Sequence, residues 1–181
     1  MDNFEDFDDF LIEDEVLKER KKKGINGKKK GNRTELDLAK LLNVRFGEGF
    51  SRTVGSGMIG TQRGHYLPKH ARDVFSGDLV VPKGFKFVIE SKGGYESIDM
   101  SSVFVHGNSE LDNFMNQVTD DSKRCGRKPL LCWKKTRKPW LAFVHTVELK
   151  GLEFKYKMEY GKWTCIALEH LLKLEDSFFI D

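Results

Sequence analysis

The sequence predicts an α/β protein in which a small mixed β-sheet is flanked by helices. Two segments have apolar residues at helical spacing, and several short runs rich in β-branched and aromatic residues lie between and after them. The expected elements follow the order α-β-β-β-α-β-β, which is typical of a sheet covered by helices. A chain of 181 residues is long enough to bury one core of this kind.

The N-terminal part is predicted to be an arm rather than part of the core. Residues 1–19 hold nine acidic residues and one lysine, with Phe4, Phe7 and Phe10 spaced among the acids. This pattern fits either a short amphipathic helix or a disordered arm that orders on a partner. The lysines and glycines that follow in residues 20–27 have no apolar periodicity and predict a flexible basic linker.

The predicted organisation is therefore an acidic arm with a basic linker over residues 1–27, and a single domain over residues 28–181 with a C-terminal strand and helix extension. Without its first 19 residues the chain carries 30 basic and 19 acidic residues, a net charge of +11. Such a charge indicates a polyanionic partner, and the acidic arm could screen it from random contacts. Charge alone also fits a role in solubility only.

The first helix is predicted to begin near Asn32. Leu38, Leu42 and Phe46 lie on one stripe, and Glu35 lies in line with them, so its side chain is expected to point at the sheet. Asn32 and Glu35 also have the spacing of a capping box, with Asn32 as the N-cap. A capping role and a functional role for Glu35 are both open and do not exclude each other.

Three strands are expected next, and the third has two distinct faces. They are "GFSRTV" before a glycine-rich loop, "GDLVVP", and "FKFVIESK" after a Pro-Lys-Gly turn. Because alternate residues of a strand face the same side, Phe85, Phe87 and Ile89 form a packing face. Glu90 and Lys92 fall on the other face.

The second helix is predicted over "SELDNFMNQVTDDSKRC", where apolar residues recur at helical spacing before a glycine. The segments that follow are predicted as strands at "KPLLCWKK", "KPWLAFVHTV", "EFKYKM" and "KWTCIAL" and a terminal helix at "LEHLLKL". The last seven residues, "EDSFFID", are expected to pack on the domain as a final turn, although docking on a partner protein is an alternative.

The composition gives no sign of a membrane-spanning protein, a disulfide framework or a histidine-built metal site. No apolar run approaches the ~20 residues that a membrane span needs, and the acidic N-terminus is the reverse of a signal peptide. The three cysteines form no CxxC pair and the histidines have no metal-binding spacing, so reduced thiols in a cytoplasm are expected.

Three acidic residues and a lysine are the candidates for a metal-binding and catalytic site. Glu90 and Lys92 lie roughly 7 Å apart along one strand face, and Asp78 opens the preceding apolar strand, which could bring its carboxylate beside Glu90. Two carboxylates at a sheet edge suit Mg²⁺ or Mn²⁺, and an adjacent lysine could polarise a water or neutralise charge on phosphorus. Glu35 is a possible third acid. The alternative is a solvated strand face with an ion pair, and an Asp78 that is an ordinary turn residue.

In this order the motifs resemble the PD-(D/E)xK nuclease superfamily, and more narrowly the archaeal and phage Holliday-junction resolvases. The matching segments are "KKKGNRTELDLAKLL", "SRTVGSG", "GDLVVP", "FVIESK" and "NQVTDDSKRCGRKPLLCWKK", which span residues 28 to about 145. The resemblance implies a restriction-endonuclease-like fold with a central mixed β-sheet flanked by helices. The chain departs from the pattern in reading Gly-Asp where the family has Pro-Asp, and in its long loop, acidic arm and C-terminal extension.

The resemblance also implies an activity, which is Mg²⁺-dependent cleavage of four-way DNA junctions by a homodimer, with Mn²⁺ expected to substitute. It implies that Asp78 and Glu90 are metal ligands, assisted by the backbone carbonyl of Ser91. Glu35 would hold this metal or a second one, and Lys92 would orient the attacking water. On the second helix, Gln117 matches a position that in relatives often faces the active site. Asp73 is a rival to Asp78 as the first metal ligand.

DNA is expected to be held mainly through its phosphates. The candidate contacts are Lys28, Lys29, Lys30, Arg33, Arg52, Ser56, Gly57, Lys123, Arg124, Lys134, Lys135 and Arg137. Two other functions stay open: a nicking or restriction-like nuclease with the same core, and a non-catalytic DNA-binding accessory protein. The expected setting is the cytoplasm of a microbial or phage-infected cell, with the acidic tails as possible docking segments for a protein partner.

Overall fold

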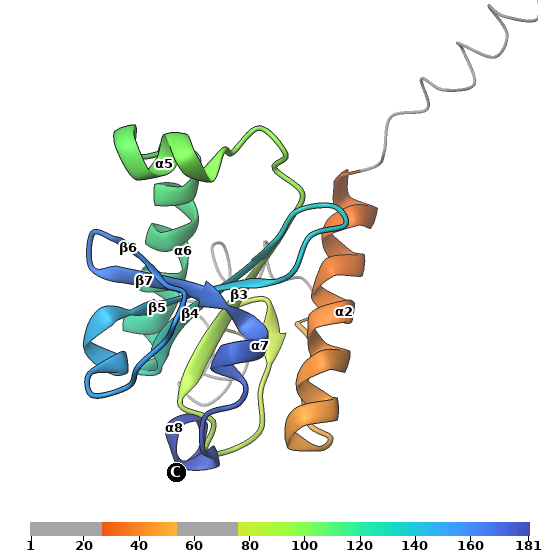
Figure 1. Cartoon of the computed structure of the whole chain (residues 1–181). Helices are drawn as coiled ribbons and strands as arrows, with labels where there is room; N and C mark the ends of the chain where they lie inside the picture. The colour runs from red at the N-terminus through yellow and green to blue at the C-terminus, as the bar shows by residue number, and fades with distance from the viewer. Residues whose placement is uncertain (1–26, 54–75) are drawn as a thin grey trace, which may run out of the picture. The chain divides into compact units, whose positions relative to one another are not determined.

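The protein is described here by a computed structural model that covers residues 27–53 and 76–181 (Figure 1). The chain divides into two units, residues 1–30 and residues 31–181, and the second unit holds the fold described below. The arm and linker of residues 1–26 lie outside the described ranges, so the predicted domain boundary stays a prediction. None of the helices in the described ranges is long and apolar enough to cross a membrane.

A five-stranded mixed sheet is the centre of the fold, as the sequence predicts. In spatial order its strands are β3 (Phe87–Gly93), β4 (Lys128–Lys134), β5 (Leu141–His145), β7 (Trp163–Ala167) and β6 (Met158–Tyr160). Strands β3 and β4 run parallel, and the other pairs are antiparallel. A separate two-stranded antiparallel pair is made by β1 (Ser51–Arg52) and β2 (Leu79–Val80).

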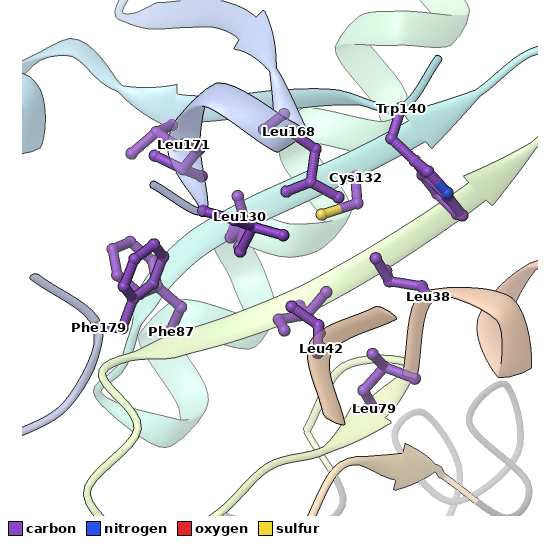
Figure 2. Packing of buried hydrophobic residues seen from close by; sticks show 14 of the residues in the cluster. Leu38, Leu42, Leu79, Phe87, Leu130, Cys132, Trp140, Leu168, Leu171 and Phe179 are labelled. Atoms are coloured by element: carbon purple, nitrogen blue, oxygen red, sulfur yellow. The ribbon is translucent and has the colours of Figure 1, made fainter. Parts of the chain in front are cut away.

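Two long helices cover opposite faces of this sheet, α2 (Gly27–Phe46) and α6 (Ser109–Cys125) (Figure 1). Leu38 and Leu42 of α2 pack in one core cluster with Phe87 of β3, and Figure 2 shows these side chains among the buried residues of that cluster. The apolar residues of α6 form the other cluster, with Val88, Leu131 and Phe143 from the sheet. Each buried side chain of this size contributes about 1.5–3 kcal/mol, so the two stripes hold the layers together.

Helix α6 has clear start and stop residues. The Asn108 side chain accepts hydrogen bonds from the backbone N–H groups of Glu110 and Leu111. Gly126 ends the helix in the left-handed conformation at φ 75°, which glycine adopts without a Cβ clash. The predicted second helix is therefore confirmed.

The predicted start of the first helix is wrong. Helix α2 begins at Gly27, so Asn32 lies inside the helix and cannot serve as its N-cap. The lysine-rich run has no apolar periodicity, yet lysine is a good helix former, and this allows the helix to extend toward the N-terminus. Glu35 is consequently not the third residue of a capping box.

The elements between β3 and α6, and after β5, differ in detail from prediction. A short helix α5 (Met100–His106) lies between β3 and α6, where none of the predicted elements falls, and it is capped by the Asp99 side chain. The strand expected around residues 153–158 is displaced toward the C-terminus. Phe154 packs against the core from a loop, and the actual strand β6 pairs with β7 only from Met158 onward. A 3-10 turn, η3 (Thr146–Leu149), follows β5.

The C-terminal segment packs on the domain, as expected. Helix α7 (Leu168–Leu171) is shorter than the predicted terminal helix, and α8 (Asp176–Phe179) follows it. Phe179 is fully buried against Phe87 and Phe85, and Figure 2 shows it beside Phe87 in the cluster covered by α7.

Candidate active site

The charged face of β3 is buried rather than solvated. Val88, Glu90 and Lys92 share this face, and Val88 packs in the α6 cluster. Glu90 is only 1% exposed. The interpretation of the two charges as a solvated strand face is therefore wrong, and a carboxylate held beneath a helix calls for a partner of opposite charge.

Asp78 lies alongside β3, next to Glu90 in space. Its backbone N–H donates to the Ile89 carbonyl at 2.9 Å, and its Oδ2 accepts from the Ser91 N–H at 2.9 Å. The Asp78 carbonyl accepts from the Thr53 N–H at 2.9 Å. Three hydrogen bonds thus fix this residue, and they bring its carboxylate to the strand that carries Glu90, as the sequence predicts.

The backbone conformation at position 77 explains why a glycine, and not a proline, precedes Asp78. The φ of Gly77 is +77°, a value that proline cannot adopt. A Cβ at this position would lie 2.6 Å from the Ile89 carbonyl oxygen and 2.8 Å from the Val88 Cγ2. The departure from the family's Pro-Asp therefore follows from a turn that runs tightly against β3.

Lys92 lies between a carboxylate and an amide. Its Nζ is 2.6 Å from the Glu90 Oε1 and donates to the Gln117 Oε1 at 3.0 Å. The same ammonium lies 5.2 Å from the ring centroid of Phe114, one turn earlier on α6. The structure thus brings Gln117 to Lys92, at the position to which the family resemblance points.

Glu35 enters the site from α2. It is nearly buried, and its carboxylate pairs with the Arg52 guanidinium from β1. The Glu35 charge also acts on Asp78, where it contributes to a raised pKa. Arg52, a candidate DNA contact, is thus engaged with Glu35 in the free protein.

The site concentrates negative charge in a place shielded from water. Burial raises the pKa of Glu90 well above its ordinary value, and the neighbouring Asp78 adds to this, while Lys92 opposes it. Burial likewise raises the pKa of Asp78, against the lowering effect of the Ser91 N–H and Lys92. Burial alone would lower the pKa of Lys92, but Glu90 and Asp78 outweigh it and raise that pKa. Asp78 and Glu90 together therefore carry more negative charge than Lys92 alone can neutralise.

The oxygen atoms of this cluster fit a hard divalent cation. Within the described residues, neither Glu90 carboxylate oxygen receives a well-directed hydrogen bond, although Oε1 faces the Lys92 ammonium. Carboxylate and carbonyl oxygens are the ligands that Mg²⁺ prefers, completed by water or phosphate. Over residues 27–53 and 76–181, no three His, Cys, Asp or Glu side chains converge to form a metal site by themselves. Asp78 and Glu90 would thus supply only part of a coordination sphere.

Asp121 is a buried acid of the site that the sequence did not single out. It lies on α6 and pairs with Arg124, and its charge contributes to raising the pKa of Glu90. Its position in the run "TDDSKRC" gives no sign of burial, because charged runs on helices usually face water.

The candidate DNA contacts are spread over several elements. Arg33 and Arg137 are exposed, Lys123 pairs with Asp120, and Lys134 lies over the Trp140 ring. The side chains of Lys28, Lys29 and Lys30 are not described, and Ser56, Gly57 and the rival ligand Asp73 lie outside the described residues. Asp73 and Asp78 therefore both stay candidates for the first metal ligand.

Gly93, at the end of β3, controls how closely α2 approaches the sheet. A Cβ on Gly93 would lie 2.1 Å from the Thr34 Oγ1. Gly93→Ala is therefore expected to push the helix turn that carries Glu35 away from β3, at a stability cost of about 1–3 kcal/mol measured by urea unfolding. Gly31→Ala, on the same helix, is the matched control because nothing lies within 4 Å of its Cβ position. Equal stability of the two variants would contradict the close approach.

Comparison with known proteins assigns the class. The family model described as "phage putative PDDEXK endonuclease" matches residues 26–175. The chain belongs to this family, and hence to the PD-(D/E)xK nuclease superfamily that the motifs resemble. The α/β fold with a five-stranded mixed sheet agrees with this class. The protein is accordingly a nuclease by family.

Among curated proteins, the chain is similar to Protein D14 of Escherichia phage T5. The two are 27% identical over 121 residues, which cover 65% of this chain and 69% of Protein D14. No solved structure matches the chain significantly. The family and this relative both connect the chain to phages.

Proposed function

We propose that the protein is a structure-specific endodeoxyribonuclease that hydrolyses phosphodiester bonds in four-way DNA junctions and depends on Mg²⁺, with Mn²⁺ as a substitute. The observation that carries the proposal is the buried cluster of Asp78, Glu90 and Lys92 at the edge of the sheet. Its excess negative charge lies in a chain whose residues 20–181 carry a net charge of +11. A cation bound at the cluster would offset the negative charge of these acids and so allow a polyanionic substrate to approach them.

Asp78 and Glu90 are the side chains that would hold the cation, with the Ser91 backbone carbonyl as a further ligand. Within the described residues the Glu90 Oε2 has no hydrogen-bond partner, and the Ser91 N–H keeps the Asp78 carboxylate in place. When bound, Mg²⁺ supplies Lewis-acid stabilisation of the charge on the phosphate. Glu35 lies near enough to act on Asp78 and would support this ligand or hold a second ion.

Lys92 would orient the attacking water and offset phosphate charge. The Glu90 Oε1 and the Gln117 Oε1 hold its ammonium from two sides, at 2.6 Å and 3.0 Å. A lysine fixed by two partners needs little reorganisation when charge develops on the substrate. Gln117 is in this scheme the residue that fixes the direction of the lysine.

Selectivity for branched DNA is proposed to come from a homodimer, whose two sites at fixed separation would cut two strands symmetrically. Exposed basic residues such as Arg33 and Arg137 would bind phosphates. Arg52 would do so after exchanging Glu35 for a phosphate. The phage relative fits action in an infected host cell, and the acidic tails remain candidates for docking a protein partner.

A cleavage assay with matched DNA substrates tests this function. A synthetic four-way junction, the linear duplex of one arm and a single strand of the same sequence are incubated with Mg²⁺ or with EDTA. We expect paired nicks in opposite strands of the junction with Mg²⁺ and none with EDTA. Equal cutting of the duplex would favour the nicking or restriction-like alternative. Tight junction binding without cleavage in Mg²⁺ or Mn²⁺ would favour the accessory protein.

A further inference from the structure

We propose that Glu96 is a positioning residue for DNA binding, which fixes the basic turn of residues 134–138, "KKTRK", beside the end of β3 that carries Lys92. In that position the exposed Arg137 and Lys138 would meet a phosphate of the DNA backbone next to the bond that is cut. The inference rests on the proposed function for its substrate, DNA. It concerns an acid outside the motif.

The first support is the place of the basic turn in the fold. The turn joins β4 to β5, and it begins where the parallel strand β3 ends, because Lys92 and Gly93 pair with Trp133 and Lys134. The Gly94 N–H donates to the Lys134 carbonyl at 2.9 Å, and the Trp133 Nε1 donates to the Gly94 carbonyl at 3.0 Å. The turn therefore starts directly beside the lysine of the site.

The second support is the set of hydrogen bonds between Glu96 and the turn. The Glu96 Oε1 accepts from the Thr136 backbone N–H at 2.9 Å and from the Thr136 Oγ1 at 2.6 Å. The Lys135 Nζ donates to the Glu96 backbone carbonyl at 3.2 Å. Since the carboxylate binds an amide and a hydroxyl, which carry no net charge, it contributes to the geometry of the turn and does more than neutralise the lysines.

The third support is the backbone on both sides of this contact. In residues 27–53 and 76–181, Tyr95 and Arg137 are the only non-glycine residues with positive φ, at 57° and 60°, and they adjoin Glu96 and Thr136. A Cβ is crowded in this conformation, so it persists where surrounding contacts hold it, which is common at functional sites. The Tyr95 ring also packs on Phe114, which lies against the lysine of the site.

A positioning role and a role of charge alone predict opposite effects on DNA binding. Glu96 is an exposed acid beside basic residues, so removing only its charge should strengthen binding of a polyanion. Removing the oxygen that holds the turn should weaken binding. Both bonds from Thr136 reach the same Glu96 oxygen, and the amide oxygen of a glutamine can accept both. The alanine and glutamine variants of Glu96 therefore separate the two roles.

The first test measures the affinity of the full-length protein for a fluorescent four-way junction by anisotropy, in EDTA so that no strand is cut. Glu96→Ala is expected to weaken binding at least about 3-fold. Glu96→Gln is expected to bind at least as tightly as the wild type. Equal affinities of the two variants would overturn the positioning role.

The second test asks whether the turn contacts phosphate. Arg137→Ala is expected to reduce the slope of log affinity against log salt concentration by about 0.9, the value for one lost phosphate contact. Lys150→Ala is the matched control, because Lys150 is also exposed but lies after β5, whereas the turn lies before it. This control should keep the wild-type slope. An unchanged slope in Arg137→Ala would overturn the assignment of the turn to DNA.

The third test needs no DNA or metal. The NMR order parameter of the Thr136 amide is expected to fall from about 0.85 to below about 0.6 in Glu96→Ala and to keep its wild-type value in Glu96→Gln. An unchanged order parameter in Glu96→Ala would overturn the positioning role. Should the wild type bind the junction without cutting it, the proposed function fails while these measurements still decide the role of Glu96. A wild type that binds no DNA would overturn both.

Discussion

Replacing Glu90 by glutamine is expected to reduce Mg²⁺-dependent DNA cleavage by at least about 100- to 1,000-fold. The substitution preserves the shape of the side chain and removes one of the two carboxylates that would hold the cation. It also removes the anion that, together with Gln117, holds the Lys92 ammonium. Single-turnover cleavage with Mg²⁺ measures the effect, with Glu159→Gln, exposed on β6, as the control.

The same substitution is expected to leave the fold intact. Glu90 is 1% exposed, and burial raises its pKa well above the ordinary value even with Lys92 beside it, so its charge opposes folding. The free energy of unfolding of Glu90→Gln should therefore equal or exceed that of the wild type. Mn²⁺ should raise the unfolding temperature of the wild type only. Cleavage within a few-fold of wild type would show that Glu90 is not part of the catalytic centre.

Changing Gly77 to proline, which recreates the Pro-Asp of the wider superfamily, is expected to destabilise this protein by at least about 3 kcal/mol. Proline fixes φ near −65°, whereas Gly77 has φ +77°. Proline also carries a Cβ, which at this position would clash with the Ile89 carbonyl oxygen.

Alanine variants separate the two causes, strain and crowding. Gly77 and Gly151 both have positive φ, +77° and +84°, but nothing lies within 4 Å of a Cβ on Gly151. Gly151→Ala should cost only the about 1–2 kcal/mol of left-handed strain, and Gly77→Ala should cost more because of the crowding. Urea unfolding of both variants measures the difference. Equal losses would mean that the turn does not press on β3.

The sequence predicts much of the site because β3 has a strict two-residue period. That period separates Phe87 and Ile89, which pack under α2, from Glu90 and Lys92, which lie under α6. The position of Gln117 came from the resemblance, and the structure places its amide on Lys92. Local pattern was sufficient in these cases because each strand face meets a single helix.

Other features depend on contacts that no local pattern records. The spacing of Asn32 and Glu35 imitates a helix start, although the helix begins earlier at Gly27. Helix α5 buries only Val103, so it has no apolar stripe to detect. Asp121 is buried although it lies in a charged run on α6 whose pattern gives no sign of burial. Long-range contacts of this kind need the folded structure.

The position of Asp78 bears on how an inactive form of the protein should be made. Strand β3 is at the edge of the five-stranded sheet, and the Asp78 N–H and Oδ2 bond the Ile89 carbonyl and the Ser91 N–H. The carboxylate thus satisfies a backbone donor of this edge strand. A variant without the Asp78 carboxylate is expected to lose cleavage and also to leave the Ser91 N–H without this partner. Glu90→Gln keeps this hydrogen bond, which makes it the better choice for trapping uncut DNA on the protein.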